Sequence, residues 1–271
     1  MEFFQLQRAI SGVNPDIVFK IGGYPISNST MLIAFVGLVF LFFSLVVIRK
    51  FSIIPRSRLQ SVTEIAYEGV FGLIDQVTGD KRVTVKVFPI AAALFFYIIT
   101  ANLISTVLPG LTSITYDGIS LFRTPTSDFN TTFGLALGAI ILTHVVSIRD
   151  WGLFGHLGKF FQIMPIIKGF KKSASEGGMA IVGFFVGILD IVGEIAKVIS
   201  LSLRLFGNLY AGEVLMVVIF GGLAYFLPAI WMAMSTLSGI VQAVVFCLLF
   251  TSYYTSSLRP IEDVPEEKRD L

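Results

Sequence analysis

The sequence has little charge, few histidines and almost no cysteine. Charged residues make up 14% of its 271 positions, against about 25% in an average soluble domain, which is too few to cover a soluble fold of this length. Cys247 is the only cysteine, and this excludes an intrachain disulfide and a multi-cysteine metal site. The two histidines, His144 and His156, have no ligand cluster around them. We therefore expect no metal, and we expect both histidines to have structural or interfacial roles.

Signatures for binding nucleic acids and nucleotides are missing as well. The net charge is only +2 and no basic stretch is interleaved with aromatic residues, so we expect no nucleic-acid partner. Without a glycine-rich phosphate loop we expect no direct nucleotide binding and no cofactor. What is present is 55% hydrophobic residues and a mean hydropathy of +0.83. These values indicate an all-α, polytopic helical membrane protein.

Long uncharged runs predict five membrane spans, because a spanning helix needs about 20 mostly apolar residues. We place the spans at residues 30–48, 87–108, 129–148, 179–226 and 229–258 of a single membrane domain, between an N-terminal segment (1–29) and a C-terminal tail (259–271). Residues 56–78 have apolar side chains at helical spacing with charges between them. This pattern predicts an amphipathic helix on the membrane surface, or an extramembrane helix packed on a partner.

Lysine and arginine are distributed unequally between the two sides of this topology. Fifteen lie on the side of the C-terminal tail, and three lie on the side of the N-terminal segment. The positive-inside rule therefore predicts an N-terminus outside and a C-terminus in the cytoplasm. We expect a bacterial plasma membrane, although the charge asymmetry alone fits an organelle membrane equally well.

The fourth predicted span is too long for an upright helix. Its residues, 179–226, would extend about 70 Å as a helix, whereas the hydrocarbon core is about 30 Å thick. An ordinary tilt of about 20° does not absorb this difference. Either the helix breaks or it lies far from the membrane normal.

Ionisable residues within the fourth span are the main functional signal. They cost a few kcal/mol each at that depth and normally mark an ion path or a buried partner. Arg204 has no acidic residue within four positions and keeps its proton at any relevant pH, so we expect its carboxylate partner on another chain. Glu213 points to the opposite helix face. Asp190 and Glu194 lie nearest the cytoplasmic end, with Lys197 a turn further in. A headgroup position is an equally good interpretation for Asp190 and for Lys197, whose long side chain can reach the interface.

The residues around Arg204 resemble the signature of subunit a of F-type ATP synthases, the membrane stator. The stretch reads Ser200-Leu-Ser-Leu-Arg204-Leu-Phe-Gly207-Asn208-Leu-Tyr210-Ala-Gly212-Glu213. Asn102 to Pro109, Pro125-Thr-Ser-Asp128-Phe-Asn130-Thr-Thr and Gln242 are similar to other parts of the family pattern. The resemblance covers roughly residues 30–258. It departs at Ser235, where many members carry His or Glu seven residues before the glutamine.

The resemblance implies that the last two spans form a long, strongly tilted hairpin. It also implies an ion-translocating stator subunit of a rotary ATP synthase that is not catalytic by itself. Its implied partners are a rotor ring of small c-type subunits facing Arg204, b-type subunits of a peripheral stalk, and the lipid bilayer. H+ or Na+ would reach and leave ring carboxylates through two offset half-channels separated by Arg204. The implied translocation residues are Arg204, Glu213, Asn208 and Gln242, with Asp128, Asn130 and Ser235 as outer half-channel candidates and Asp190 and Glu194 as cytoplasmic ones.

Two other functions stay open on the residues alone. A self-contained secondary ion transporter or channel is suggested by Asp190, Glu194 and Glu213 on one helix, and it predicts ion flux through the purified chain. A purely structural membrane anchor is the third hypothesis. The intramembrane charges argue against an anchor, and the lack of an internal repeat argues against an inverted-repeat transporter.

Overall fold

A computed structural model of the chain describes residues 15–50, 57–107, 115–116, 119–160, 174–222 and 227–258. The first part of the expected N-terminal segment (1–14) and the whole expected tail (259–271) lie outside the described residues. Within the described ranges the chain is predominantly helical and has two short β-hairpins.

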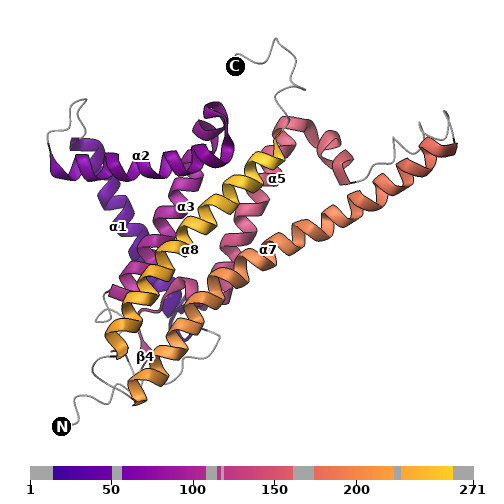
Figure 1. Cartoon of the computed structure of the whole chain (residues 1–271). Helices are drawn as coiled ribbons and strands as arrows, with labels where there is room; N and C mark the ends of the chain where they lie inside the picture. The colour runs from indigo at the N-terminus through magenta and orange to yellow at the C-terminus, as the bar shows by residue number, and fades with distance from the viewer. Residues whose placement is uncertain are drawn as a thin grey trace, which may run out of the picture.

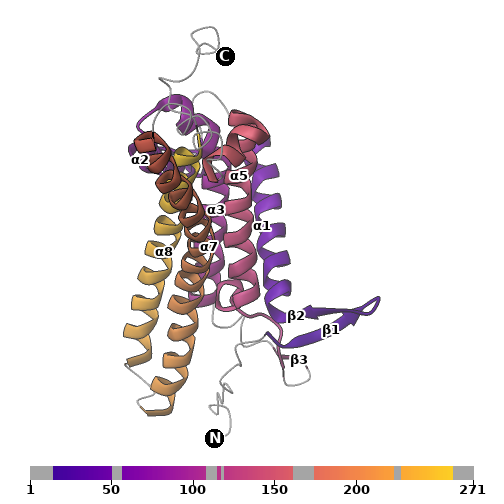
Figure 2. The same ribbon diagram turned by 90° about the vertical axis from the view of Figure 1, so that its right-hand side faces the viewer.

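Five helices in these ranges are long and apolar enough to cross a bilayer. They are α1 (Asn28–Lys50), α3 (Lys81–Val107), α5 (Phe129–Phe160), α7 (Ala174–Gly222) and α8 (Leu227–Ser257). Figures 1 and 2 show α1, α3 and α5 as neighbouring upright helices, with the α7–α8 pair slanted against them. The predicted class, an all-α polytopic membrane fold, is confirmed.

The slanted helix α7 decides between the two alternatives for the fourth span. It is continuous over 49 residues, about 74 Å at 1.5 Å per residue, and Figure 1 shows it running diagonally away from the bundle. The helix therefore tilts instead of breaking. It begins at Ala174, before the expected start at 179, because Gly177 and Gly178 weaken a helix by about 1 kcal/mol each without ending it. Residues 223–226 of the expected span lie outside the described part.

Two other helices also extend beyond the apolar runs that mark them. The first turns of α3 contain Lys81, Arg82 and Lys86, and α5 continues through Arg149 and beyond residue 148 to Phe160. Lysine and arginine end a membrane-compatible stretch, but they are good helix formers, so the helix continues into the polar phase. Charge therefore marks the edge of the apolar segment and not the end of the helix.

The surface helix α2 (Arg58–Thr78) lies across the ends of the spanning helices (Figure 1). Ser57 caps its N-terminus by accepting from the backbone N–H of Gln60, and Gly79 ends it with a left-handed φ of 67°. Val70 and Ile74 are buried in the main apolar core, whereas Val62 and Ile65 are exposed. One-sided burial of this kind fits the amphipathic helix expected at 56–78.

Two β-hairpins were not predicted from the sequence. β1 (Ile17–Ile21) pairs antiparallel with β2 (Tyr24–Ser27), and β3 (Thr115–Tyr116) pairs with β4 (Ile119–Ser120). Gly22 and Gly23 connect the first pair with φ values of 57° and 88°, as a two-residue turn with both φ angles positive requires. The Gly-Gly pair between two apolar runs was the available signal.

The β1–β2 hairpin and α2 mark opposite ends of the bundle, which we call the β end and the α2 end (Figures 1 and 2). α5 and α8 run from the β end to the α2 end, and α7 runs in the opposite direction. The main core between them contains nearly fully buried side chains from α3, α7 and α8, among them Ile98, Leu201, Leu205, Phe246 and Phe250. This core holds α7 and α8 together over the part of α7 nearest the β end.

Candidate functional site on the α7–α8 hairpin

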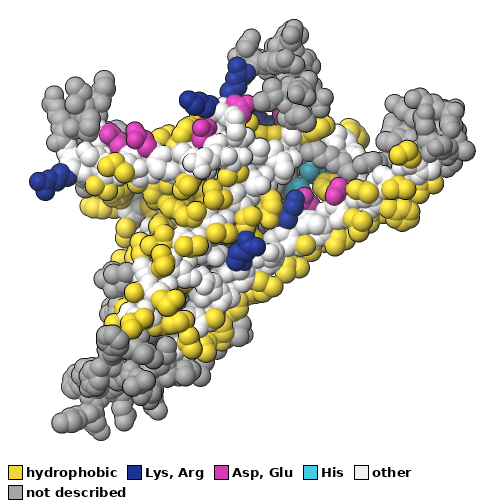
Figure 3. Space-filling view, in the orientation of Figure 1, with side chains coloured by type: hydrophobic (Ala, Val, Ile, Leu, Met, Phe, Trp, Pro, Cys, Tyr) yellow, Lys and Arg dark blue, Asp and Glu magenta, His cyan; other side chains and the backbone are white. Residues whose placement is uncertain are grey.

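Arg204 lies on the exposed side of α7, in the part of the helix that packs on α8. Its side chain is exposed, and its neighbours Ile199 and Leu203 are 49% and 50% exposed. Figure 3 shows basic side chains on α7 within a largely apolar surface. Within the described part of the chain, Arg204 forms no hydrogen bond or ion pair. The structure thus presents a permanent cation on a surface that is otherwise suited to lipid or to an apolar partner.

Polar contacts join α7 to α8 on the side of the β end. Ser238 Oγ donates to Asn208 Oδ1 at 2.8 Å, and Trp231 Nε1 donates to the carbonyl oxygen of Gly212 at 3.1 Å. Ser235 lies between these contacts, with its Oγ 3.6 Å from the position that a Cβ on Gly212 would occupy. The small residue at 212 therefore allows α8 to approach α7 closely.

The contact between Asn208 and Ser238 also sets the register of this antiparallel pair. Moving four residues along each helix towards the α2 end brings Arg204 level with Gln242. Gln242 is 6% exposed, and its Nε2 has no hydrogen-bond partner within the described residues. A buried amide donor without a partner costs about 1–3 kcal/mol. The level of Arg204 therefore holds both an exposed cation and an unsatisfied donor.

Glu213 follows Gly212 on α7 and is half-buried. From the β end towards Arg204, the α7–α8 interface carries Ser235 beside Gly212 and then the Asn208–Ser238 hydrogen bond, and Glu213 is the next residue on α7 after Gly212. The structure brings these residues of the predicted site onto one pair of helices.

Asp128 and Asn130 lie apart from that interface, at the start of α5. Asp128 follows the short 3-10 helix η1 (Pro125–Ser127) and is 4% exposed. Its carboxylate accepts from the backbone N–H of Asn130 at 3.0 Å and from Thr131 Oγ1 at 3.1 Å. These bonds cap the N-terminus of α5, while the Asn130 side chain is exposed. Asp128 therefore has a structural role, and its role in an ion path stays a prediction.

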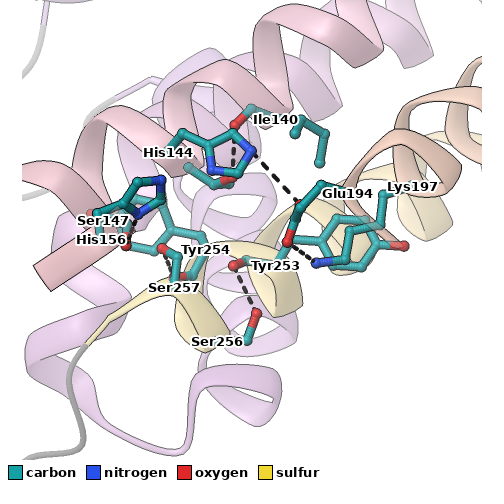
Figure 4. A network of polar contacts seen from close by, with 11 residues as sticks. Ile140, His144, Ser147, His156, Glu194, Lys197, Tyr253, Tyr254, Ser256 and Ser257 are labelled. Carbon is teal, nitrogen blue, oxygen red and sulfur yellow. Dashed lines mark hydrogen bonds and ion pairs between the residues drawn. The ribbon is translucent and has the colours of Figure 1, made fainter. Parts of the chain in front are cut away.

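Asp190 and Glu194 lie in the half of α7 nearer the α2 end. Asp190 is exposed, whereas Glu194 contacts two other titratable groups. Its Oε1 accepts from Lys197 Nζ at 2.7 Å, and its Oε2 lies 3.8 Å from Nε2 of His144 on α5. Figure 4 shows this cluster between α5, α7 and the end of α8.

Sequence reasoning missed the contact between His144 and Glu194. The two residues are fifty positions apart, and no local periodicity relates positions on two different spans. The available signal was weak: a single histidine near the end of one span, and an acid near the corresponding end of the next.

The sequence is similar to those of known membrane subunits of one family. Residues 29–255 match the family described as ATP synthase A chain. The chain belongs to this family. ATP synthase subunit a of Moorella thermoacetica is 32% identical over 241 residues, which cover 89% of this chain and 95% of the relative. ATP synthase subunit a 2 of a Picosynechococcus species is 26% identical over 263 residues, covering 96% and 97%.

Membership of the ATP synthase A chain family confirms the predicted function. The chain is an integral membrane subunit of a rotary ATP synthase, a non-catalytic stator component that takes part in ion translocation. It works in a complex with other ATP synthase subunits. The hypotheses of a self-contained transporter and of a passive anchor are not supported.

Proposed function

We propose that Arg204 separates two ion half-channels and faces the ionised carboxylates of a rotor ring of small c-type subunits. The observation that carries this proposal is an exposed Arg204 on slanted α7, without an ion-pair partner in the described part of the chain. A fixed positive charge favours the ionised form of a nearby carboxyl group and repels a cation that would otherwise leak directly between the half-channels.

The outer half-channel begins at the β end and follows the α7–α8 interface. Glu213, Ser235 and Asn208 supply polar groups along it, and Gln242 ends it at the level of Arg204. Asp128 and Asn130 are further candidates at the start of α5. An ion arriving here, H+ or Na+, neutralises a ring carboxylate, and a neutral site can then face lipid as the ring turns.

The second half-channel opens at the α2 end beside Asp190 and Glu194. Glu213 and Asp190 are separated by about 35 Å along the helix at 1.5 Å per residue. Because α7 is strongly slanted (Figure 1), this separation displaces the two openings sideways as well as in depth. Lateral offset is what obliges an ion to travel with the ring from one opening to the other.

The α2 end faces the cytoplasm in this proposal, with the N-terminus outside a bacterial plasma membrane. The distribution of basic residues supports this orientation, because fifteen lie on the C-terminal side and three on the other. Subunits of b type from a peripheral stalk are the other protein partners that we propose.

The test is ATP-driven ion pumping in membranes that carry the whole complex with Arg204→Ala. We expect the complex to assemble and coupled pumping to be lost, because the two half-channels are no longer separated by a charge. Leu203→Ala, which changes the exposed neighbour without changing charge, is the matched control and should pump normally. Normal pumping by assembled Arg204→Ala would reduce the arginine to a structural charge and overturn the proposal.

A further inference from the structure

His144 contacts the second half-channel, yet the function proposed above gives it no role. In Figure 4 its ring on α5 points towards Glu194 on α7. The His144 Nε2 and Glu194 Oε2 atoms are 3.8 Å apart, and the two side chains are 31% and 25% exposed. The two side chains therefore lie next to each other, and both are partly exposed at the surface of the chain.

We propose that His144 and Glu194 form a proton-transfer pair, in which His144 carries the proton between Glu194 and water at the α2 end. This inference rests on the proposed function, because it assumes that the translocated ion is H+ and that it leaves the ring beside Glu194. It replaces the structural or interfacial role expected for His144 from the sequence.

The two carboxylate oxygens of Glu194 have different contacts, one with Lys197 and one with His144. The Lys197 ammonium is hydrogen-bonded to Oε1 at 2.7 Å and lies 5.1 Å from the centroid of the Tyr253 ring on α8. Oε1 is therefore held in an ion pair with a residue one turn away on the same helix. Oε2, the other oxygen, faces the imidazole of His144 and can exchange a proton with it.

A bend in α5 holds the His144 ring in place. His156 would be about 18 Å further along a straight helix, yet the two imidazole centroids are only 5.3 Å apart. The bend is at Gly152, with φ 73° and ψ 163°, and it folds the end of α5 back over His144. His156 is itself hydrogen-bonded to Ser147 Oγ through Nδ1 at 2.9 Å, so its contact with His144 is through the ring edge and face.

The proposed transfer balances in protons and charge. A proton that leaves the ring binds Oε2 of the Glu194 carboxylate, and the neutral carboxyl keeps the hydrogen bond from Lys197 on Oε1. The proton then moves from Oε2 to the unprotonated Nε2 of neutral His144, which leaves a carboxylate and an imidazolium. The imidazolium then releases one proton to water at the α2 end and returns to its neutral form. A gap of 3.8 Å is longer than a hydrogen bond, so the step requires a small approach of α5 and α7 or one bridging water.

The experiment is chemical rescue by imidazole in inverted membrane vesicles that contain the whole complex. The variants are His144→Ala and, as the matched control, Val145→Ala, which changes the next side chain on α5, 53% exposed. We expect ATP-driven proton pumping by His144→Ala to fall by about 100-fold, the lower end of the range for a positioned acid–base group. Added imidazole should restore a measurable part of that pumping. It should have no such effect on wild type or Val145→Ala, which controls for its action as a permeant base.

His144→Gln tests the same idea with less loss of packing. Glutamine keeps hydrogen-bonding capacity but carries no proton at neutral pH, so it should show the same loss and leave no space for rescue. A merely structural link between α5 and α7 would respond differently, because imidazole free in solution cannot tie two helices together. Wild-type pumping in an assembled His144→Gln complex would overturn the proposal, as would a loss in His144→Ala that imidazole does not relieve.

Arg204→Ala in the same vesicles separates this inference from the function on which it rests. If Arg204→Ala uncouples the complex while both His144 variants pump normally, only the proton-transfer pair is wrong. If Arg204→Ala also pumps normally, the proposed half-channels themselves are wrong.

Discussion

Asp128 combines, at the scale of a single residue, a visible structural task with a proposed functional one. It is almost fully buried, and both of its carboxylate oxygens accept hydrogen bonds from the first turn of α5. Capping needs an oxygen acceptor at this position but no negative charge, because asparagine caps helices as well as aspartate does. An ion path that uses Asp128 needs a group that titrates. These two requirements can be separated by the choice of substitution.

Asp128→Asn should therefore assemble and resist heat like wild type, but pump more slowly if the carboxylate lies in the outer half-channel. Asp128→Ala should in addition lose about 1 kcal/mol of stability, because the cap is removed. Thermal unfolding of the complex and the initial rate of ATP-driven pumping measure the two effects on the same samples. Equal pumping by Asp128→Asn and wild type would remove Asp128 from the path and leave it as a cap alone.

Gln242 differs from Asp128, because its buried side-chain amide nitrogen has no hydrogen-bond partner within the described residues. Its buried Nε2 lacks a hydrogen-bond acceptor within the described residues, and the register of α7 and α8 brings it level with Arg204. A water molecule within the proposed outer half-channel would supply such an acceptor. This fits a polar path that ends at the level of Arg204.

At the scale of elements, the bend in α5 is the feature that organises the α2 end. Gly152 adopts φ 73° and ψ 163°, a region that is essentially restricted to glycine. A Cβ at this position would meet no atom within 4 Å, so the restriction comes from the backbone alone. The bend returns His156 and Phe160 to the ring of His144.

Gly152→Ala should destabilise this end of the protein by about 1–3 kcal/mol through backbone strain. Gly158→Ala is the matched control: it lies after the bend, has no positive φ, and also has open space around its Cβ. Thermal unfolding of the assembled complex measures both variants. Equal stability of the two would show that α5 can relax around residue 152 without strain.

The length of α7 is the property on which the proposed function depends. α7 is about 74 Å long by its residue count in a layer of about 30 Å, so it must lie across the membrane at a slant. The slant separates its two groups of acids sideways and leaves Arg204 between them. In a shorter, upright helix the same acidic residues would differ in depth but would not be displaced sideways from one another.

At the scale of the whole molecule, the proposed function makes the chain one wall of an ion path and not a complete path. Arg204 lies on the outer surface of the chain and not in its interior. The isolated fold also exposes large apolar side chains on α1, including Leu38 and Phe42 at 66% and 72%, a surface that lipid or other subunits must cover. In the proposed function, ion transfer thus requires a rotor ring that moves past α7.

The purified chain in liposomes should therefore conduct no ions under an imposed gradient, because neither proposed half-channel crosses the bilayer and Arg204 repels cations between them. Reconstitution of the chain with its rotor ring and stalk subunits should produce flux. A fluorescent pH indicator inside the liposomes measures H+, and a sodium indicator measures Na+. Flux through the chain alone would favour the self-contained transporter.

The fold class and many residues of the candidate site can be predicted from the sequence because the relevant physics is local. Exposing long apolar runs to water and burying charges in lipid both cost free energy. The spans and the isolated Arg204 can therefore be recognised from the sequence alone. The β1–β2 hairpin also has a local sequence signal, the Gly22-Gly23 pair between two apolar runs. The bend at Gly152 had no such signal, because an isolated glycine within a helical pattern is usually tolerated.

The sequence by itself thus determined the membrane class, the number of apolar helices long enough to span a bilayer, the excess length of the fourth span and the candidate residues for an ion path. Only the tertiary structure decided that α7 is continuous and slanted, that Gln242 lies level with Arg204, and that His144 meets Glu194. The physical reason is that these features depend on how separate helices pack. Hydropathy is set by each segment alone, whereas register, tilt and contacts between helices are set by the side chains of two elements at once.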